Sequence, residues 1–305
     1  MNCVLSYRNL PTMLRCVMPV GLRRIMCPLS TFVPEGLMAI CSAFQQLEFL
    51  CCGLTVLLSS KEMRGRKFSS LKTLHLGLAN NVPNIDSILA CFGSVEEFSL
   101  TAYDHLEDFK SMHLPWDTLK RVRVGKIRSC NIISFSSPDQ LDSFSTSLPT
   151  LLHLPDFSNL EHLALFGVGR TSTAKIAAAV RKSSQNIRSL TLHFPACNKG
   201  GVLLDDLTWL LETATNVTSI SLTSMDGSLC KLLCKLKMLE ELILFSPCCH
   251  RYILCVAAHC SVPNGGSLRK IKFVVERMTV DMGTMEMCQM VGVVIVKGHP
   301  STKCC

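Results

Sequence analysis

A six-residue pattern recurs along this chain and constrains its fold more than any other feature. Each copy has an apolar residue, two variable residues, a second apolar residue, one variable residue and a third apolar residue, as in LKTLHL from Leu71. Successive copies begin 22–30 residues apart, except for one interval of 41 residues. A steady period of this length is the signature of a repeat architecture. The ten copies begin at Leu22, Leu47, Leu71, Val95, Leu119, Leu160, Ile187, Val217, Leu239 and Leu268.

Each repeat is predicted to contain a short strand followed by a turn and a helix. The end of each copy alternates apolar and polar residues, which is the period of a half-buried strand. Between copies the apolar spacing becomes helical. The predicted helical faces are Leu207, Leu210, Leu211 and Ala214; Ile176, Ala179 and Val180, after an N-cap at Thr171 or Ser172; and Leu229, Leu232, Leu233 and Leu236. One such unit cannot bury its apolar faces alone, but stacked units build a continuous core.

This pattern, over about residues 22–275, resembles the leucine-rich-repeat family. Units of this length with a helix are similar to the ribonuclease-inhibitor-like subclass. The lead-ins FSNL (157–160), SQNI (184–187) and ATNV (214–217) are similar to those of fungal F-box leucine-rich-repeat proteins. The resemblance implies an α/β solenoid of about ten repeats, with a curved parallel sheet on one face and helices on the other. It also implies the substrate-recognition domain of an F-box-type receptor in a cullin ubiquitin ligase.

Residues 1–21 precede the repeats and are predicted to be a cap or the remnant of an F-box-like region. NLPTMLRCVMP (9–19) is similar to the opening of an F-box, but repeat-like sequence follows from Leu22. A complete F-box is therefore not expected. The repeat domain is assigned to residues 22–275.

Two segments depart from the pattern. The interval of 41 residues contains a serine-rich insertion at about 126–158, which is either a degenerate repeat near NIISF (131–135) or, as favoured here, a loop. Residues 276–305 are predicted to form an atypical C-terminal cap or tail, in which MVGVVI from Met290 could add a last strand. Terminal repeats need such a cap because their core is otherwise open.

The composition is that of a folded protein, because hydrophobic residues make up 48% of the 305 residues and charged residues 18%. No uninterrupted apolar run reaches the length of a membrane helix, about 20 residues. The N-terminus lacks the order of a signal peptide. We therefore expect a cytoplasmic or nuclear protein whose 18 cysteines are reduced thiols, acting mainly as small buried hydrophobes.

The stretch CCHRYILCVAAHC (248–260) offers an alternative function, that of a metal-binding or redox-sensing protein. In register with the repeats it occupies a helix on which Cys249 and Cys260 lie on the core face. Cys255 and His259, at i and i+4, could chelate one metal ion. No C-x-x-C pair supplies the remaining ligands of a structural zinc site. We therefore predict neither a metal site nor a cofactor.

Catalysis has no support from local motifs, because no nucleophile elbow, phosphate-binding loop, dinucleotide fingerprint or H-E-x-x-H is present. A non-enzymatic binding protein is the prediction. Arg121, Arg123, Lys126 and Arg128 cluster without interleaved aromatics, which argues against a nucleic-acid groove despite the net charge of +8. No membrane partner is expected either.

The predicted partner is a protein that presents acidic and hydroxyl groups. Under the F-box resemblance it is a ubiquitination substrate, with a cullin-ligase adaptor as a further partner. The alternative is a stand-alone scaffold or inhibitor without a ligase role. The variable strand positions should face the partner, since they point onto the sheet surface. These candidate contact residues are Thr73, His75, Glu97, Ser99, Arg121, Arg123, His162, Ser189, Thr191, Ser219, Ser221, Glu241, Lys270 and Lys272.

Overall fold

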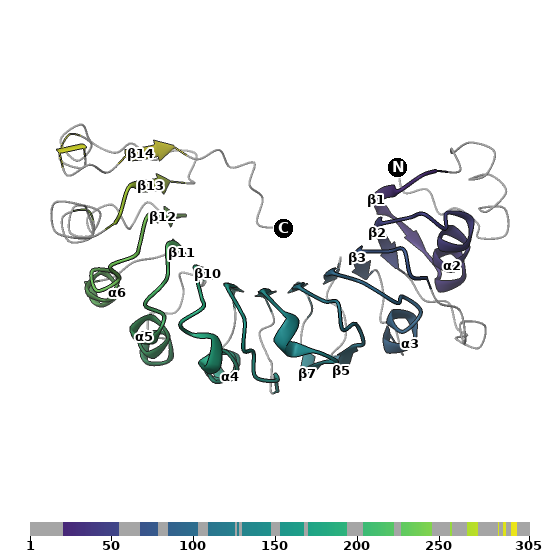
Figure 1. The fold of residues 1–305 in the computed structure, drawn as a ribbon, viewed down its shortest axis with the longest axis horizontal. Coiled ribbons are helices and arrows are strands. Elements are labelled where there is room, and N and C mark those ends of the chain that lie inside the picture. Colours follow the sequence, from purple (N-terminus) through teal and green to yellow (C-terminus); the bar gives the residue numbers. More distant parts are fainter. Residues whose placement is uncertain are drawn as a thin grey trace. The chain divides into compact units, whose positions relative to one another are not determined.

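The computed structural model shows an α/β protein that divides into two compact units, residues 1–155 and 156–305, which we call unit 1 and unit 2 (Figure 1). Each unit is described by itself. The residues that the structure describes are 21–54, 68–78, 85–102, 109–125, 127, 130–147, 153–167, 170–193, 204–222, 227–245, 257, 267–273, 286, 289–290 and 294–297.

Unit 1 contains a parallel sheet with the strand order β1-β2-β3-β4-β6-β8. The strands are β1 (Arg24–Phe32), β2 (Phe49–Leu54), β3 (Thr73–Leu78), β4 (Glu97–Ala102), β6 (Arg121–Gly125) and β8 (Ser143–Thr146). One side of this sheet carries the helices α2 (Pro34–Ala43) and α3 (Ile85–Leu89) (Figure 1). On the same side lies a smaller parallel sheet, formed by β5 (Phe109–Leu114) and β7 (Cys130–Phe135). The prediction of a helix in every repeat was therefore wrong for the repeats from Val95 and Leu119, whose connections contain these strands.

Unit 2 is also built on a parallel sheet, with the strand order β9-β10-β11-β12-β13-β14. The strands are β9 (His162–Phe166), β10 (Ser189–His193), β11 (Ser219–Leu222), β12 (Glu241–Leu244), β13 (Lys270–Phe273) and β14 (Val294–Lys297). Three helices lie together on one side of the sheet: α4 (Arg170–Ala179), α5 (Leu204–Thr213) and α6 (Gly227–Leu233) (Figure 1).

The core lies between each sheet and its helices, and the six-residue pattern supplies it. In the copy from Leu71, that residue, Leu74 and Leu76 are all buried. Each of the ten copies found in the sequence contains a strand of one of the two large sheets, so those strand predictions are confirmed. The helical faces are confirmed at the buried residues Ile176, Ala179, Val180, Leu210, Leu211, Ala214, Leu232, Leu233 and Leu236. Leu229, predicted on the same face as Leu232, is only half-buried.

The capping prediction for α4 was wrong. The helix begins at Arg170, so Thr171 and Ser172 lie inside its first turn rather than before it.

The serine-rich interval is not a loop at 130–135 or at 143–146, because both segments are strands. The strand in the large sheet belongs to LDSFST, in which Leu141, Phe144 and Thr146 are buried at the three apolar positions. A threonine at the third position hid this repeat from a purely apolar pattern. The alternative prediction, a degenerate repeat at 131–135, was also wrong, since that segment pairs with β5 in the smaller sheet.

The last strand, β14, was expected from Met290 but lies two residues further along. Ile295 is paired with Ile271, which is the second apolar position of the preceding copy. That register puts the start of the last copy at position 292. With β8 and β14, the sheets contain more strands than the expected ten repeats.

The lead-ins before the strands link each repeat to its predecessor. The Asn186 side chain donates to the carbonyl of Ser158 at 2.9 Å, and Asn216 donates to the carbonyl of Gln185 at 2.8 Å. Ser267 repeats the contact with its hydroxyl, at 2.9 Å from the carbonyl of Lys237. These bonds satisfy carbonyl groups at the turns, which would otherwise need water.

Among the described residues, no helix is both long enough and apolar enough to cross a membrane.

Candidate functional site

The candidate contact residues lie on the side of each sheet that faces away from the helices, which we call the strand face. In unit 1 they form two rows across neighbouring strands. Thr73, Glu97 and Arg121 are aligned in the first row, and His75, Ser99 and Arg123 in the second.

The strand face of unit 2 also carries two rows of candidate residues. The first row contains His162, Ser189, Ser219, Glu241 and Lys270, and the second contains Thr191, Ser221 and Lys272. Ser221 is buried, His162 and Arg121 are exposed, and the other candidates in the two units are half-buried. The structure therefore brings the predicted residues together within each unit.

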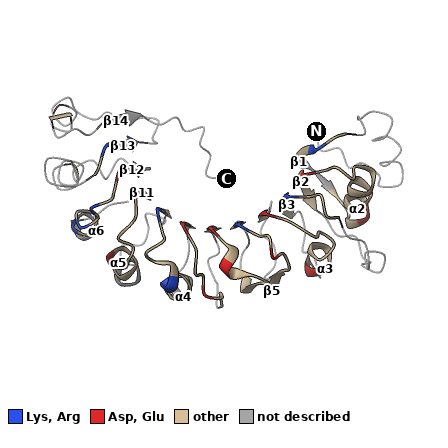
Figure 2. Ribbon diagram, viewed as in Figure 1, with Lys and Arg blue, Asp and Glu red and all other residues tan. Residues whose placement is uncertain are grey.

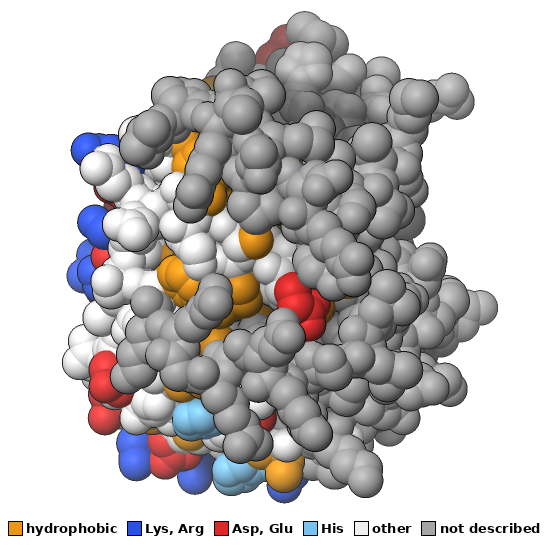
Figure 3. All heavy atoms as spheres, turned by 90° about the vertical axis from the view of Figure 1, so that its right-hand side faces the viewer, with side chains coloured by type: hydrophobic (Ala, Val, Ile, Leu, Met, Phe, Trp, Pro, Cys, Tyr) orange, Lys and Arg blue, Asp and Glu red, His pale blue; other side chains and the backbone are white. Residues whose placement is uncertain are grey.

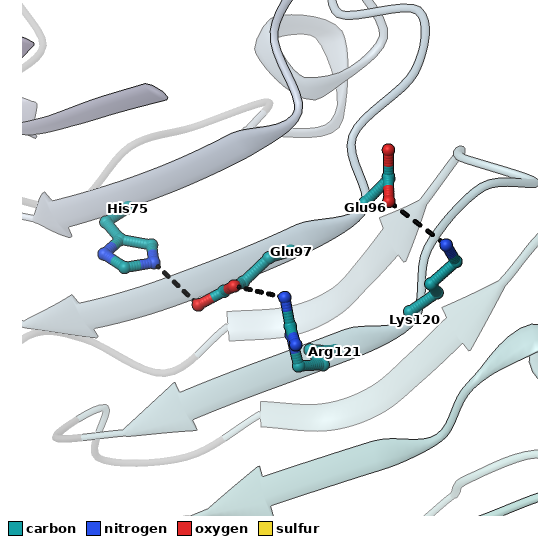
Figure 4. Close-up of polar contacts among 5 residues, drawn as sticks. All are labelled: His75, Glu96, Glu97, Lys120 and Arg121. Carbon is teal, nitrogen blue, oxygen red and sulfur yellow. Dashed lines mark hydrogen bonds and ion pairs between the residues drawn. The ribbon is translucent and has the colours of Figure 1, made fainter. Parts of the chain in front are cut away.

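Glu97 joins two neighbouring strands of unit 1 through its carboxylate (Figure 4). His75 Nε2 lies 3.3 Å from Glu97 Oε1, and Arg121 donates to Glu97 Oε2 at 3.0 Å. All three side chains are partly exposed, so each pair contributes about 0–1 kcal/mol to stability. The charge of Arg121 is thus compensated inside the protein.

Arg24 and Phe49 extend the first row of unit 1 and were absent from the sequence prediction. The Arg24 guanidinium lies 4.0 Å from the centre of the Phe49 ring, and that ring contacts His75 edge-on at 5.3 Å. A cation over an aromatic face is attracted by the ring quadrupole. These contacts orient the side chains of Arg24, Phe49 and His75 on the strand face.

Unit 2 has a similar arrangement on β12 and β13. Lys270 donates to Glu241 Oε1 at 2.9 Å, while the Ser219 hydroxyl lies 3.5 Å from Glu241 Oε2. As in unit 1, a glutamate at the first position of one strand compensates the cation at the first position of the next. Lys272, the second lysine of β13, takes no part in this contact.

The residues just before the strands form a second charged feature, which we call the edge ladder. Its charges alternate in sign from strand to strand in each unit, with Thr218 as an uncharged interruption (Figure 2). Its members are Arg23, Glu48, Lys72, Glu96, Lys120 and Asp142 in unit 1, and Glu161, Arg188, Thr218, Glu240 and Arg269 in unit 2. On the surface in Figure 3, acidic and basic side chains lie side by side along the left and lower margins.

The backbone holds the edge ladder in register. The carbonyl of Glu48 accepts hydrogen bonds from the amides of both Lys72 and Thr73. The same pair of hydrogen bonds to one carbonyl recurs at successive strands. Ladder side chains meet as ion pairs, such as Lys120 with Glu96 at 3.1 Å (Figure 4). Opposite charges on adjacent strands stabilise the correct alignment. Because its charges cancel, the ladder is a poor surface for attracting a charged partner.

An aromatic cluster lies at the C-terminal ends of strands in unit 2, two residues after the second candidate row. His193 contacts Phe166 at 5.0 Å and Phe245 at 4.2 Å between ring centres, and its Nε2 lies 3.2 Å from the Ser221 hydroxyl. Burial lowers the pKa of His193 to about 4, so its ring is neutral at pH 7. The sequence prediction missed this cluster because the six-residue pattern ends one residue before it. The signal was present as aromatic residues following the pattern.

A polar groove runs along the strand starts of unit 2. Its volume is about 550 Å³, and its lining includes Asn186, Asn216, Glu161, Arg188 and Met238. The two asparagine amides already bind backbone carbonyls, and Arg188 lies 3.9 Å from Glu161. The polar groups named here are therefore already engaged in contacts within the protein.

A serine–histidine contact occurs on the smaller sheet of unit 1. His113 Nδ1 lies 3.0 Å from the Ser134 hydroxyl, and its Nε2 lies 3.5 Å from the Ser136 hydroxyl. Asp86 accepts from the backbone amide of His113 at 3.0 Å rather than from its ring. The carboxylate thus does not orient the imidazole as it would in a catalytic triad.

The described cysteines are free thiols. Burial raises the pKa of six of them, Cys27, Cys41, Cys51, Cys52, Cys91 and Cys130, and so disfavours their thiolates. Burial, with a smaller effect of Cys91, raises the pKa of Cys41 to about 12, and burial raises that of Cys130 to about 11. Thiols of this kind are poor nucleophiles and poor metal ligands at neutral pH. Among the described residues, no group of three or more histidine, cysteine or acidic side chains is placed to hold a metal ion.

The cysteine-rich stretch 248–260 lies outside the described residues except for Ala257. Ala257 is buried, and it would share a helical arc with Cys249 and Cys260 at about 100° per residue. The role of Cys255 and His259 stays a prediction.

No protein-family model matches the chain, and no curated protein matches it significantly. A function for this protein therefore has to be argued from its own geometry.

Proposed function

We propose that this protein binds another protein through the strand faces of its repeats. The observation that carries the proposal is the arrangement of half-buried polar side chains in rows on a sheet surface opposite the helices. Side chains of that surface vary from strand to strand, while the positions that face the core are apolar with few exceptions such as Thr146. Stacked repeats use such a surface to recognise extended partners.

By resemblance, we propose the more specific role of a leucine-rich-repeat domain that recognises substrates for an F-box-type ubiquitin ligase. The long parallel sheets are compatible with such a repeat fold. The asparagine contacts of the lead-ins add a repeated structural role for the residues on which the resemblance rests. A stand-alone scaffold or inhibitor built on the same repeats would use the same face but would not meet a cullin-ligase adaptor.

The test uses affinity purification with mass spectrometry and two matched variants. Thr191→Arg places a long charged side chain on the strand face of β10, and Ala178→Arg places the same side chain on the exposed side of α4. We expect partners of the wild-type protein to be lost with Thr191→Arg and retained with Ala178→Arg. Retention of every partner by both variants would argue against this part of the strand face. Co-purification of the cullin adaptor separates the ligase role from the stand-alone role.

A further inference from the structure

One arginine on the strand face of unit 1 has no partner inside the described structure. Arg121 shares Glu97 with His75, but Arg123, two residues further along the same strand, makes neither an ion pair nor a side-chain hydrogen bond with any described residue. Arg123 is nevertheless half-buried. A half-buried guanidinium has lost part of its hydration, and a ligand that supplies acceptors restores those interactions.

The neighbours of Arg123 in its row are both serines. Ser99 on β4 and Ser145 on β8 are its register partners on the two sides. Neither serine side chain forms a hydrogen bond with a described residue. Adjacent strands lie about 4.8 Å apart, so the two hydroxyls flank the arginine on the same face. Ser145 entered this row only because the unrecognised repeat at Leu141 places β8 beside β6.

These three side chains match the chemistry of a carboxylate. A guanidinium offers parallel N–H donors that fit the two oxygens of a carboxylate, and a charge-assisted pair of this kind is stronger than a neutral hydrogen bond. Each serine hydroxyl can donate one further hydrogen bond. Positive charge on this face and negative charge on the partner would be complementary.

Unit 2 contains the same plan with weaker chemistry. Glu241 compensates Lys270, and Lys272, two residues along, forms no ion pair or side-chain hydrogen bond with a described residue. Its register partners are Ile243 and Val296, which supply no hydroxyls. Lysine also lacks the planar fork of arginine. The stronger anchor of the two is therefore the one at Arg123.

We infer that Arg123, together with Ser99 and Ser145, binds the carboxylate of an aspartate or glutamate in an acidic segment of the protein partner. This inference rests on the proposed function and specifies the partner's chemistry. A nucleic acid fits less well, since Arg121, the other arginine on the outward side of this strand, is already paired with Glu97. Nucleic-acid grooves need a sustained basic track, whereas the charges here alternate in sign.

The test selects peptides from a random library of 12-residue sequences on the immobilised full chain. We expect the wild-type protein to enrich peptides containing Asp and Glu. Arg123→Gln should reduce the affinity for the selected peptide about tenfold to a hundredfold, the range for losing a charged hydrogen bond. Arg123→Lys keeps the charge without the fork and should give a smaller loss. Substituting Gln for the acidic residue of the peptide should reproduce the effect of Arg123→Gln.

Lys120→Gln is the matched control, because it removes one positive charge from the neighbouring edge ladder, where Lys120 pairs with Glu96. We expect it to leave peptide affinity within about twofold of the wild type, since exposed charges are screened over about 10 Å in salt. Circular dichroism and thermal melting of each variant establish that it is folded. If Arg123→Gln does not fold, the affinity of the wild type is compared with that of Arg123→Lys and with the affinity for the peptide that carries Gln in place of its acidic residue.

Three outcomes would overturn the inference. Selected peptides could lack acidic enrichment, Lys120→Gln could weaken binding as much as Arg123→Gln, or a single-stranded oligonucleotide could bind more tightly with the same dependence on Arg123. Peptides that are selected without acidic enrichment but are lost with Thr191→Arg would leave the proposed function standing. Failure to select any peptide on a folded protein would count against both.

Discussion

The buried indole of Trp116 gives the sharpest test of the structure of unit 1. Its Nε1–H donates to the carbonyl of Phe92 at 2.7 Å, and its ring lies 5.3 Å from that of Phe98. All three residues are fully buried. The indole therefore links the segment before β6 to the end of the preceding repeat.

Trp116→Phe keeps an aromatic ring at this site but removes the donor. Leaving the buried Phe92 carbonyl without a partner costs about 1–3 kcal/mol. The volume lost between the two side chains, about 40 Å³, costs about a further 1 kcal/mol at roughly 24 cal/mol per Å³. We expect the free energy of unfolding to fall by about 2–4 kcal/mol in total.

Urea denaturation followed by circular dichroism measures this loss, and Trp209→Phe is the control. Trp209 is half-buried on α5, with the Arg181 guanidinium 5.1 Å from its ring centre, a contact worth about 0.5–1 kcal/mol at exposed sites. The chain has two tryptophans, so the fluorescence of each variant reports on the one that remains, in unit 1 or in unit 2. If the free energy of unfolding fell by less than about 0.5 kcal/mol in both variants, the buried hydrogen bond would be refuted.

Three other predictions concern titration, reactivity and backbone. Since burial lowers the pKa of His193 to about 4, the unfolded state binds its proton first, and stability should fall as the pH drops from about 6.5 towards 4. Unfolding measured across that range should lose part of this slope in His193→Phe. Cys41 and Cys130 should resist iodoacetamide at pH 7.5 until urea is added, as judged by peptide mass spectrometry, and rapid labelling in the native protein would contradict their burial. Gly167 has a φ of +63°, so Gly167→Ala should lower the melting temperature by an amount equivalent to about 1 kcal/mol, whereas Gly21→Ala, with open space around it, should not.

Local sequence carried most of the information about where strands begin. Apolar alternation depends on residues two apart, and the buried Leu71, Leu74 and Leu76 lie at the three apolar positions of one copy. The connections were less regular than predicted, since those after β4 and β6 contain the strands β5 and β7. The pattern failed where Thr146 fills a buried position, because a hydroxyl in the core contradicts an apolar template. The register of β14 was missed by two residues for a related reason: the observed pairing puts Lys297 opposite Phe273, at a position where the template requires an apolar residue.

The candidate site was predictable as rows but not as contacts. The sequence identified Arg121 and Arg123 as outward-facing but placed the strand of His162 directly after theirs. The structure inserts β8 there, so serines rather than a histidine lie beside these arginines. The aromatic contacts of His193 also escaped prediction, since they join residues that the six-residue pattern does not cover.

The sequence by itself determined the repeated strands, most of their buried positions and the outward set of side chains, because these follow from periodicity within a few neighbouring residues. Only the tertiary structure decided which charges compensate each other. Glu97 captures Arg121 and leaves Arg123 unpaired among the described residues because of strand order and register across about 25 residues of chain. Charges of one sign look equivalent in a sequence, and they become distinct when the fold supplies a partner to one and not to the other.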